Sequence, residues 1–401
     1  MHHRTGIVSR GVSILMLAQL SAVALPAQAE DFQACVAGLK STALRAGIAP
    51  AVVRRALDIA EPKQKVLRLS KIQPEFRTPI WDYMAFLVDD QRIADGKAVI
   101  RKHAVSLARA EQRYGVDRYV IAAVWGIETD YGRTTGRNFL PHALSTLACR
   151  GGRRAAFWRR ELIAALTIVS NGDLPLDKLY GSWAGAFGQT QFMPSTYRRL
   201  AVDLDGDGKK DLVDSIPDAL GSTANYLRRA GWIAGHPRLI EVRVPADYAG
   251  PEGRRRKFSL NDWAVRGIRR TDGRLLKGSR RAGLLLPAGR HGPAFLVFRN
   301  FDAVYAYNHA ESYALAIMHL ADRLAGGGPF KTRWPTDDPG ISRAQRLQLQ
   351  KLLITRGYDI GEADGKIGKR SRAAIRQAER KLGLKVTGRA GLRIYQALGG
   401  K

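Results

Sequence analysis

The chain has 401 residues, of which 45% are hydrophobic and 25% are charged, and it carries a formal net charge of +29. This length allows two or three domains, and the composition is that of a folded protein rather than a disordered or collagen-like one. Beyond the first segment, no stretch approaches the roughly 18 consecutive apolar residues of a membrane-spanning helix, which argues against an integral membrane protein.

Residues 1–29 have the features of an export signal. Arg4 and Arg10 lie in a basic start, residues 11–25 form a short apolar run, and Ala27–Ala29 is a small-x-small cleavage site. The alternative is a retained membrane anchor. No cysteine follows the run directly, which argues against a lipoprotein. We therefore expect an exported, soluble protein with no stable membrane insertion once the signal is removed.

The large positive charge indicates a polyanionic partner. Removing Arg4 and Arg10 with the signal still leaves a charge of +27. Such a charge usually indicates nucleic acid, but export argues against nucleic acid as the partner. A cell envelope offers peptide carboxylates, phosphate-bearing polymers and lipid headgroups instead. A solvated basic surface without a specific partner is the plainer alternative.

The chain contains only two cysteines, Cys35 and Cys149. Disulfides form in oxidising compartments outside the cytosol, so an exported chain can pair its cysteines. We expect a disulfide that ties the N-terminal helices to the centre of the protein. Two separate buried thiols are the alternative.

Residues 31–115 are predicted to be helical, because segments 51–60 and 98–115 carry apolar residues at three- and four-residue spacing. The next predicted helix begins after Asp117, a good N-cap, and runs to Glu128. Glu128 follows Ile121 by seven residues and Val124 by four, so all three share the buried face.

Burial and the negative end of the helix dipole both favour the protonated form of Glu128. A carboxylic acid that stays protonated near neutral pH can donate a proton to a leaving group. The alternative is a structural glutamate paired with Arg133, Arg153 or Arg154.

A glycine-rich segment, residues 181–197, follows with the sequence GSWAGAFGQTQFMPSTY. Its glycines permit close backbone approach, while Ser182 and Gln191 offer hydrogen bonds and the aromatic residues offer flat faces for sugar rings. This mixture favours a polymer-binding groove, although a tightly packed structural loop has a similar composition.

Residues 203–214, DLDGDGKKDLVD, match much of an EF-hand loop. Asp203, Asp205 and Asp207 take its first three ligand positions, Lys209 would give its carbonyl, and Asp214 takes the last position in place of the usual glutamate. Aspartate is shorter, and the two lysines reduce the local negative charge, so a weakly bound structural Ca²⁺ is the most we expect. The alternative is a capped Asp/Gly turn without metal.

The C-terminal third changes character twice. Residues 239–301 contain short strand-like runs around basic loops, and residues 311–324 return to helix. Residues 326–340, rich in Gly and Pro, are predicted to be a linker. Residues 341–401 form two or more short helices around a turn-rich loop, which is too small for a catalytic domain and typical of a binding module.

Four motifs in this order resemble the lytic murein transglycosylases of the B type. They are GIETDYGR (126–133), GSWAGAFGQTQFMPS (181–195), STANYLRRAGW (222–232) and YNHAESYA (307–314). Residues 341–398 resemble the peptidoglycan-binding domain 1 family. The resemblance implies a mainly α fold with a lysozyme-like catalytic domain over residues 30–325, a small β-containing insertion and a three-helix module.

The resemblance also implies a chemistry. Glu128 would be the single acid and base that cleaves the bond between N-acetylmuramic acid and N-acetylglucosamine without water, leaving a 1,6-anhydro sugar. Further matching positions would contact the substrate: Ser182, Gln191, Tyr226, Asn308 and Tyr313 along the groove, and Arg153 and Arg154 at a stem-peptide carboxylate.

The resemblance implies peptidoglycan glycan strands as the partner, a periplasmic location, no cofactor for catalysis and a single Ca²⁺-type loop. No protein partner can be inferred. Hydrolytic glycosidases normally use two carboxylates, and no second acid in the motifs near Glu128 has to be catalytic. A hydrolytic muramidase and a catalytically inactive peptidoglycan-binding scaffold remain the alternatives.

Overall fold

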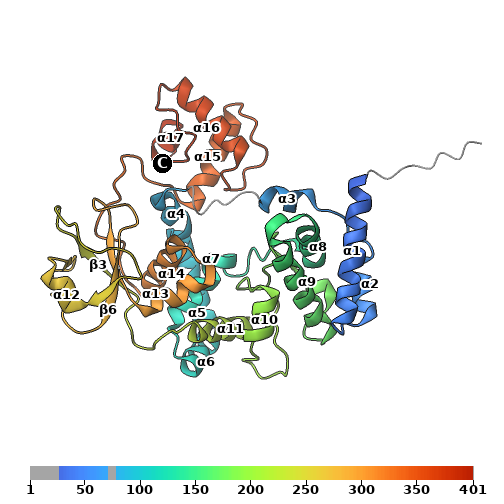
Figure 1. Cartoon of the computed structure of the whole chain (residues 1–401). Coiled ribbons are helices and arrows are strands. Elements are labelled where there is room, and N and C mark those ends of the chain that lie inside the picture. Colours follow the sequence, from blue (N-terminus) through green and yellow to red (C-terminus); the bar gives the residue numbers. More distant parts are fainter. Residues whose placement is uncertain (1–26, 71–77, 401) are drawn as a thin grey trace, which may run out of the picture.

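The computed structural model describes residues 27–70 and 78–400 and is mainly helical, with two small sheets (Figure 1). The predicted mainly α fold class with a small β-containing insertion is confirmed. The proposed export signal lies outside the described residues, except for residues 27–29 at the start of the first helix. Within the described ranges, no helix is long and apolar enough to cross a membrane.

The first lobe is a group of helices around an apolar core that includes Leu144, Leu162 and Phe187. A disulfide between Cys35 and Cys149 joins its first helix to α8, with the two Cα atoms 5.9 Å apart. The elements of this lobe are α1 (Ala27–Arg45), α2 (Pro50–Leu57), α3 (Gln64–Ser70), α8 (Leu140–Arg150), η2 (Gly152–Arg154), α9 (Ala155–Ser170), η3 (Leu176–Lys178) and α10 (Pro194–Leu200).

The second lobe surrounds a larger core at the centre of the molecule (Figure 1). Two of its helices are buried on almost every side, which explains their uninterrupted apolar sequences. They are α7 (Arg118–Thr129) and α14 (Glu311–Leu324), and they pack against each other. Around them lie α4 (Ile80–Leu87), α5 (Asp90–Lys102), α6 (Ala104–Tyr114), α11 (Ile216–Arg229) and α13 (Arg299–Asn308).

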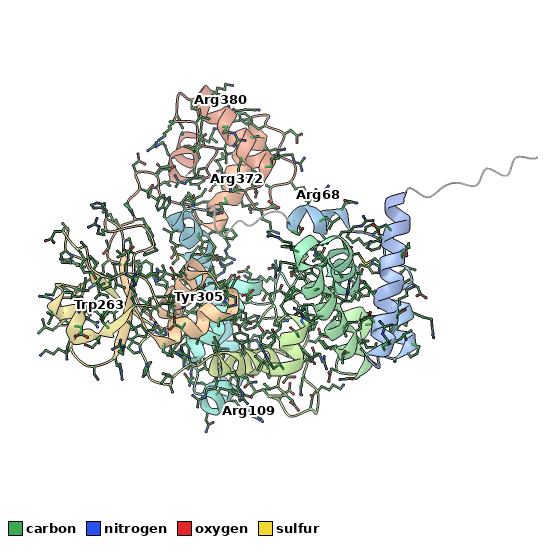
Figure 2. The ribbon with its side chains drawn as sticks, viewed as in Figure 1. Arg68, Arg109, Trp263, Tyr305, Arg372 and Arg380 are labelled. Atoms are coloured by element: carbon green, nitrogen blue, oxygen red, sulfur yellow. A yellow bond between two sulfur atoms is a disulfide. The ribbon has the colours of Figure 1, made fainter. Side chains whose placement is uncertain are left out.

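An antiparallel sheet with strand order β4-β6-β7-β3-β5 forms the predicted insertion. One face packs around Trp263, which is fully buried and labelled in Figure 2. Arg254 of the insertion stacks on Tyr305 of α13 with its guanidinium carbon 3.6 Å from the ring centroid. The insertion comprises β3 (Leu239–Arg243), β4 (Lys257–Ser259), α12 (Leu260–Val265), β5 (Arg269–Arg270), β6 (Arg281–Leu285) and β7 (Ala294–Val297).

The C-terminal module contains α15 (Arg343–Thr355), α16 (Lys369–Lys381) and α17 (Leu392–Ala397) around its own small apolar core. Ser342 and Gln345 form a capping box at the start of α15. Arg389 of the module forms an ion pair with Asp82 of α4 at 2.7 Å, so the module is docked on the second lobe.

The segment predicted as a linker, residues 326–340, is packed against the second lobe rather than free in solvent. Phe330 stacks on His319 of α14 with ring centroids 3.8 Å apart, and Trp334 packs edge-on against Phe330. Glycine and proline content predicted a linker, and the two aromatic side chains anchor it on the second lobe while most of its residues stay exposed or half-buried.

Candidate active site

Glu128 lies in the last turn of α7. The helix begins at Asp117, whose side chain accepts a hydrogen bond from the backbone N–H of Tyr119 at 2.8 Å, as the sequence predicted. Val124 and Trp125 share the buried stripe with Glu128. The glutamate itself is only partly buried, so its carboxyl lies at the edge of the core, where a substrate can reach it.

Within residues 27–70 and 78–400, one side chain donates a hydrogen bond to Glu128. The Tyr313 hydroxyl donates to Oε1 at 2.5 Å, from the first turn of α14. No described residue forms an ion pair with Glu128, so the alternative of a structural glutamate paired with an arginine has no support in the described parts of the chain. Desolvation raises the pKa of Glu128 to about 7, while the Tyr313 hydrogen bond acts in the opposite direction. The geometry is that of a proton donor.

Tyr307 lies next to Tyr313. The two rings are stacked, with centroids 6.3 Å apart and an interplanar angle of 17°, and the Tyr307 hydroxyl donates to the carbonyl of Thr190 at 2.6 Å. Burial, together with the negative charge of Glu128, raises the pKa of both tyrosines well above 10. Both therefore remain neutral hydrogen-bond donors.

The turn after Glu128 has a rarely adopted backbone conformation. Asp130 and Tyr131 have φ angles of 53° and 58°, in the left-handed region. The Tyr131 hydroxyl donates to the carbonyl of Arg92 on α5 at 3.1 Å, and its ring packs edge-on against Trp125. These contacts hold the chain in a sharp reversal directly beyond the carboxyl.

The glycine-rich segment is joined to α7 by Gln189. Its Oε1 accepts from the Trp125 indole N–H at 3.0 Å, and its carbonyl accepts from the Thr129 hydroxyl at 2.6 Å. Gly188 is required here, because a Cβ at this position would lie 2.5 Å from the carbonyl oxygen of Leu212. The segment is thus fixed beside the end of the Glu128 helix.

The residues predicted to contact substrate lie at several places around this centre. Gln191 donates to the carbonyl of Thr135 at 2.9 Å, in the loop that follows α7. The Ser182 hydroxyl accepts from the backbone N–H of Ala186 at 3.1 Å. Tyr226 packs on Tyr307 with ring centroids 4.7 Å apart. Asn308 is exposed at the end of α13.

Among the described residues, neither Arg153 nor Arg154 forms a hydrogen bond, ion pair or ring contact with Glu128 or with the side chains around it. They are exposed at the C-terminal end of α8, and the Arg154 guanidinium lies 4.8 Å from the ring centroid of Phe157. The other end of α8 adjoins the two-stranded sheet of β1 (Asn138–Phe139) and β2 (Tyr180–Gly181), which leads directly to Ser182. An 11-residue helix spans about 16 Å, so the pair lies well away from that sheet.

Tyr307 is a residue of the site that the sequence pattern did not single out, whereas Gln189 is, like Ser182 and Gln191, a side chain of the glycine-rich segment that can offer hydrogen bonds. Tyr307 lies in the motif at residues 307–314, beside Asn308, and Gln189 lies in the motif at residues 181–195, close to Gln191. Periodicity could not show that the Tyr307 ring stacks on Tyr313, because His309 ends α13 in a left-handed conformation and the next helix starts afresh. The signal that was available was the density of aromatic and amide residues in each motif.

The acidic loop differs in part from the EF-hand prediction. Carboxylate oxygens of four aspartates lie within 4.8 Å of one another: Asp203, Asp205, Asp207 and the buried Asp218. Asp214, expected to be the last ligand, lies outside this group and forms an ion pair with Lys178 at 3.0 Å. Lys209 lies within the loop, where its backbone N–H binds Asp207. Four clustered carboxylates fit a cation with oxygen ligands.

Comparison with known proteins agrees with this geometry. The model of the Transglycosylase SLT domain matches residues 31–322, and that of a putative peptidoglycan-binding domain matches residues 342–398. A curated relative, membrane-bound lytic murein transglycosylase B of Escherichia coli K12, is 35% identical over 245 residues. That match covers 61% of this chain and 66% of the relative, just under two thirds of its length.

Solved structures resemble the chain over most of its length. SltB3 from Pseudomonas aeruginosa, in complex with NAG-anhNAM-pentapeptide, is 41% identical, with a TM-score of 0.73, and covers 92% of this chain and 99% of its own. Escherichia coli Slt35, in complex with calcium, is 30% identical, with a TM-score of 0.65, and covers 75% of this chain and 94% of its own.

The lysozyme-like transglycosylase fold implied by the sequence motifs is therefore confirmed, and so is the resemblance of the C-terminal module to the putative peptidoglycan-binding domain family. The family model spans well over half of the chain, and SltB3 matches it nearly end to end. This chain belongs to the lytic transglycosylase family defined by the Transglycosylase SLT domain, with a putative peptidoglycan-binding domain at its C-terminus.

Proposed function

We propose that this protein cleaves the β-1,4 bond between N-acetylmuramic acid and N-acetylglucosamine in peptidoglycan without water, using Glu128 as its only acid and base. The observation that carries the proposal is the environment of Glu128. It has one hydroxyl donor, no cationic partner among the described residues and a pKa raised to about 7. A carboxyl with this pKa keeps a large protonated fraction near neutral pH, so it can act as the acid when the substrate binds.

The reaction then follows in two proton transfers. Glu128 gives its proton to the glycosidic oxygen as the bond to the anomeric carbon breaks, so the N-acetylglucosamine side leaves as an alcohol. The resulting carboxylate takes the proton of the muramyl C6 hydroxyl as that oxygen bonds to the anomeric carbon. The product is a 1,6-anhydro sugar, and Glu128 is protonated again.

The proposal also rests on the partners of two other acids, Asp130 and Glu161. Asp130 is bound by Arg92 and Arg343, and Glu161 accepts from the backbone N–H and hydroxyl of Ser195 at 2.9 and 2.7 Å. A hydrolase would need a second free carboxylate to activate water or form a covalent intermediate. A transglycosylase does not, because the substrate supplies the nucleophile.

We propose that the surrounding side chains bind the glycan. Tyr313, predicted to line the groove, is buried and acts through its hydrogen bond to Glu128. The partly exposed Tyr307, Ser182, Gln191 and Tyr226 and the exposed Asn308 would supply the polar surface. Arg153 and Arg154 are exposed and, in this proposal, meet a stem-peptide carboxylate farther along the strand. The SltB3 complex with NAG-NAM-pentapeptide makes such a substrate reasonable for this chain.

The C-terminal module, residues 341–401, is proposed to hold peptidoglycan while residues 30–325 cut it. The acidic loop is proposed to bind Ca²⁺ through Asp203, Asp205, Asp207 and Asp218, in a structural role. The Slt35 complex with calcium supports this assignment. Catalysis itself is proposed to need no cofactor.

The export signal and periplasmic location remain part of the proposal. Their support is the composition of residues 1–29, the Cys35–Cys149 disulfide and a substrate that lies outside the cytoplasm. Fractionation of cells that express the full chain, with an N-terminal sequence of the mature protein, tests both. Cleavage after Ala29 is the expected result.

The decisive experiment is mass spectrometry of the soluble products after the chain without residues 1–29 digests peptidoglycan sacculi. We expect anhydro-muropeptides, which are one water lighter than hydrolytic products, and none with Glu128→Gln. Reducing-end products would make the protein a muramidase. Binding without products would make it an inactive scaffold.

A further inference from the structure

The first residue of α15, Arg343, reaches from the C-terminal module into the second lobe. Its Nε and Nη2 donate to the two carboxylate oxygens of Asp89 at 2.7 and 3.0 Å, and its backbone N–H donates to Asp89 at 3.2 Å. Its Nη1 donates to Oδ1 of Asp130. One guanidinium thus binds two carboxylates of the catalytic unit at once.

Each of these two carboxylates belongs to a residue that caps a helix near the site. Asp130 is the C-cap of α7, two residues beyond Glu128. Asp89 is the N-cap of α5, where its side chain accepts the backbone N–H of Arg92 at 2.8 Å. The Arg92 side chain in turn lies 3.4 Å from Asp130. Arg343 thus links two carboxylates that Arg92 also contacts, Asp89 through its backbone N–H and Asp130 through its guanidinium.

This network is largely shielded from solvent. The side chains of Asp89 and Arg92 are 3% and 5% exposed, and that of Arg343 is 19% exposed. Burial raises the pKa of Asp89, but hydrogen bonds from Arg343 and the Arg92 N–H outweigh it and bring the pKa below its usual value. Removing Arg343 therefore leaves a buried carboxylate without its ion-pair partner.

The turn held by this network is the strained one. Asp130 and Tyr131 are consecutive non-glycine residues in the left-handed region, a conformation that persists only when its surroundings fix it. Tyr131 is fixed by packing within the catalytic unit. Asp130 is fixed by its carboxylate, to which Arg92, Arg133 and Arg343 bind. Arg133 is the most exposed and most distant of the three, at 3.5 Å and 56% exposure.

We infer that Arg343 is a positioning residue for the transglycosylase reaction: the docked module holds the turn that ends α7 and thereby keeps Glu128 against Tyr313. This inference rests on the proposed function. Arg343 does not touch the substrate and acts through Asp130. As a separate binding module, residues 341–401 would be dispensable for cleavage of short glycans, whereas these contacts make them part of the catalytic geometry.

The chain offers a matched control. Arg389 also bridges the module and the second lobe, binding Asp82 at 2.7 Å, and at 18% exposure it is as buried as Arg343. Its other partner, Asp338, belongs to the packed segment before the module. Arg389→Gln therefore weakens docking of the module as Arg343→Gln does, but it leaves the turn after Glu128 untouched.

The test uses the chain without residues 1–29 and a soluble tetrasaccharide of alternating N-acetylglucosamine and N-acetylmuramic acid, too short to engage a distant module. We expect Arg343→Gln to lower kcat about tenfold with KM within about twofold. Arg389→Gln keeps kcat within about twofold of the wild type. Asp130→Asn should reproduce the loss, because asparagine tolerates the left-handed conformation but lacks the charge that Arg343 binds. The double variant of Arg343 and Asp130 should lower kcat little further than either single variant.

Thermal unfolding of each variant separates loss of fold from loss of position. If Arg343→Gln does not fold, Asp130→Asn carries the test alone. Equal losses in the two arginine variants, or none in either, overturn the inference. Failure of the proposed function is a different result, because it is read from product mass and from Glu128→Gln and does not depend on the ratio between the arginine variants.

Discussion

Glu128→Gln tests the electrostatics of the proposed acid as well as its chemistry. In the folded state, desolvation raises the pKa of Glu128 from 4.5 to about 7. The unfolded chain therefore loses this proton at lower pH than the native state. Between these pH values the native state binds more protons, so the free energy of unfolding falls as the pH rises. Glutamine has nearly the same shape but cannot ionise.

The size of the effect follows from the two pKa values. A pKa raised from 4.5 to about 7 corresponds to about 3 kcal/mol of destabilisation once the pH exceeds 7. Glu128 is only partly buried, and solvent at its open side reduces the expected value to about 2 kcal/mol. The glutamine variant should gain this amount over the wild type between pH 4 and pH 8.

Urea unfolding of both proteins at pH 4 and pH 8 measures the difference directly. At pH 4 both side chains are neutral, so the comparison there removes effects of shape and hydrogen bonding. An identical wild-type-to-variant difference at both pH values would refute the reasoning, because it would mean that Glu128 ionises in the folded protein as it does in the unfolded chain. The same preparations, assayed on sacculi, should show activity only in the wild type.

Three further predictions follow from contacts of the site and its supports. Tyr313→Phe removes the hydroxyl whose hydrogen bond lowers the pKa of Glu128, so the alkaline limb of the kcat–pH profile should move to higher pH; a fixed limb would contradict this. Replacing Cys35 and Cys149 by serine opens a link between residues 114 positions apart and should lower the free energy of unfolding by about 4 kcal/mol in urea; a loss below about 1 kcal/mol would count against it. Saturating Ca²⁺ should stabilise the wild type by about 2 kcal/mol in thermal unfolding, and Asp205→Asn should abolish that gain; equal gains in both would place the ion elsewhere.

Local features of the fold were predictable from the sequence because local rules decide them. The Asp117 cap, the buried stripe that carries Glu128 and the capping box of Ser342 with Gln345 depend on residues within two turns of each other. The position of Glu128 as a partly buried carboxyl at a helix end follows from that stripe alone.

Contacts over long separations could not be derived in this way. The Tyr313–Glu128 hydrogen bond joins residues 185 positions apart, and the Arg343–Asp130 contact joins residues 213 positions apart. Neither contact can be predicted from the spacing of apolar residues along the sequence. The acidic loop shows the same limit, because Asp218 enters the carboxylate group from the next helix while Asp214 is drawn to Lys178. Local spacing therefore predicts Asp214 for the last ligand position, whereas the folded chain brings Asp218 to the other three aspartates.

Arg343 and Arg389 dock the C-terminal module on the second lobe, which fixes the position of the module relative to Glu128. A module on a flexible linker would leave the distance and orientation between its binding surface and the catalytic centre variable. If the module holds a glycan strand and Glu128 cleaves it, as proposed, docking keeps these two points at a constant separation. Lengthening the segment 326–340 would leave the separation between the module and Glu128 unchanged as long as the two arginines keep their partners.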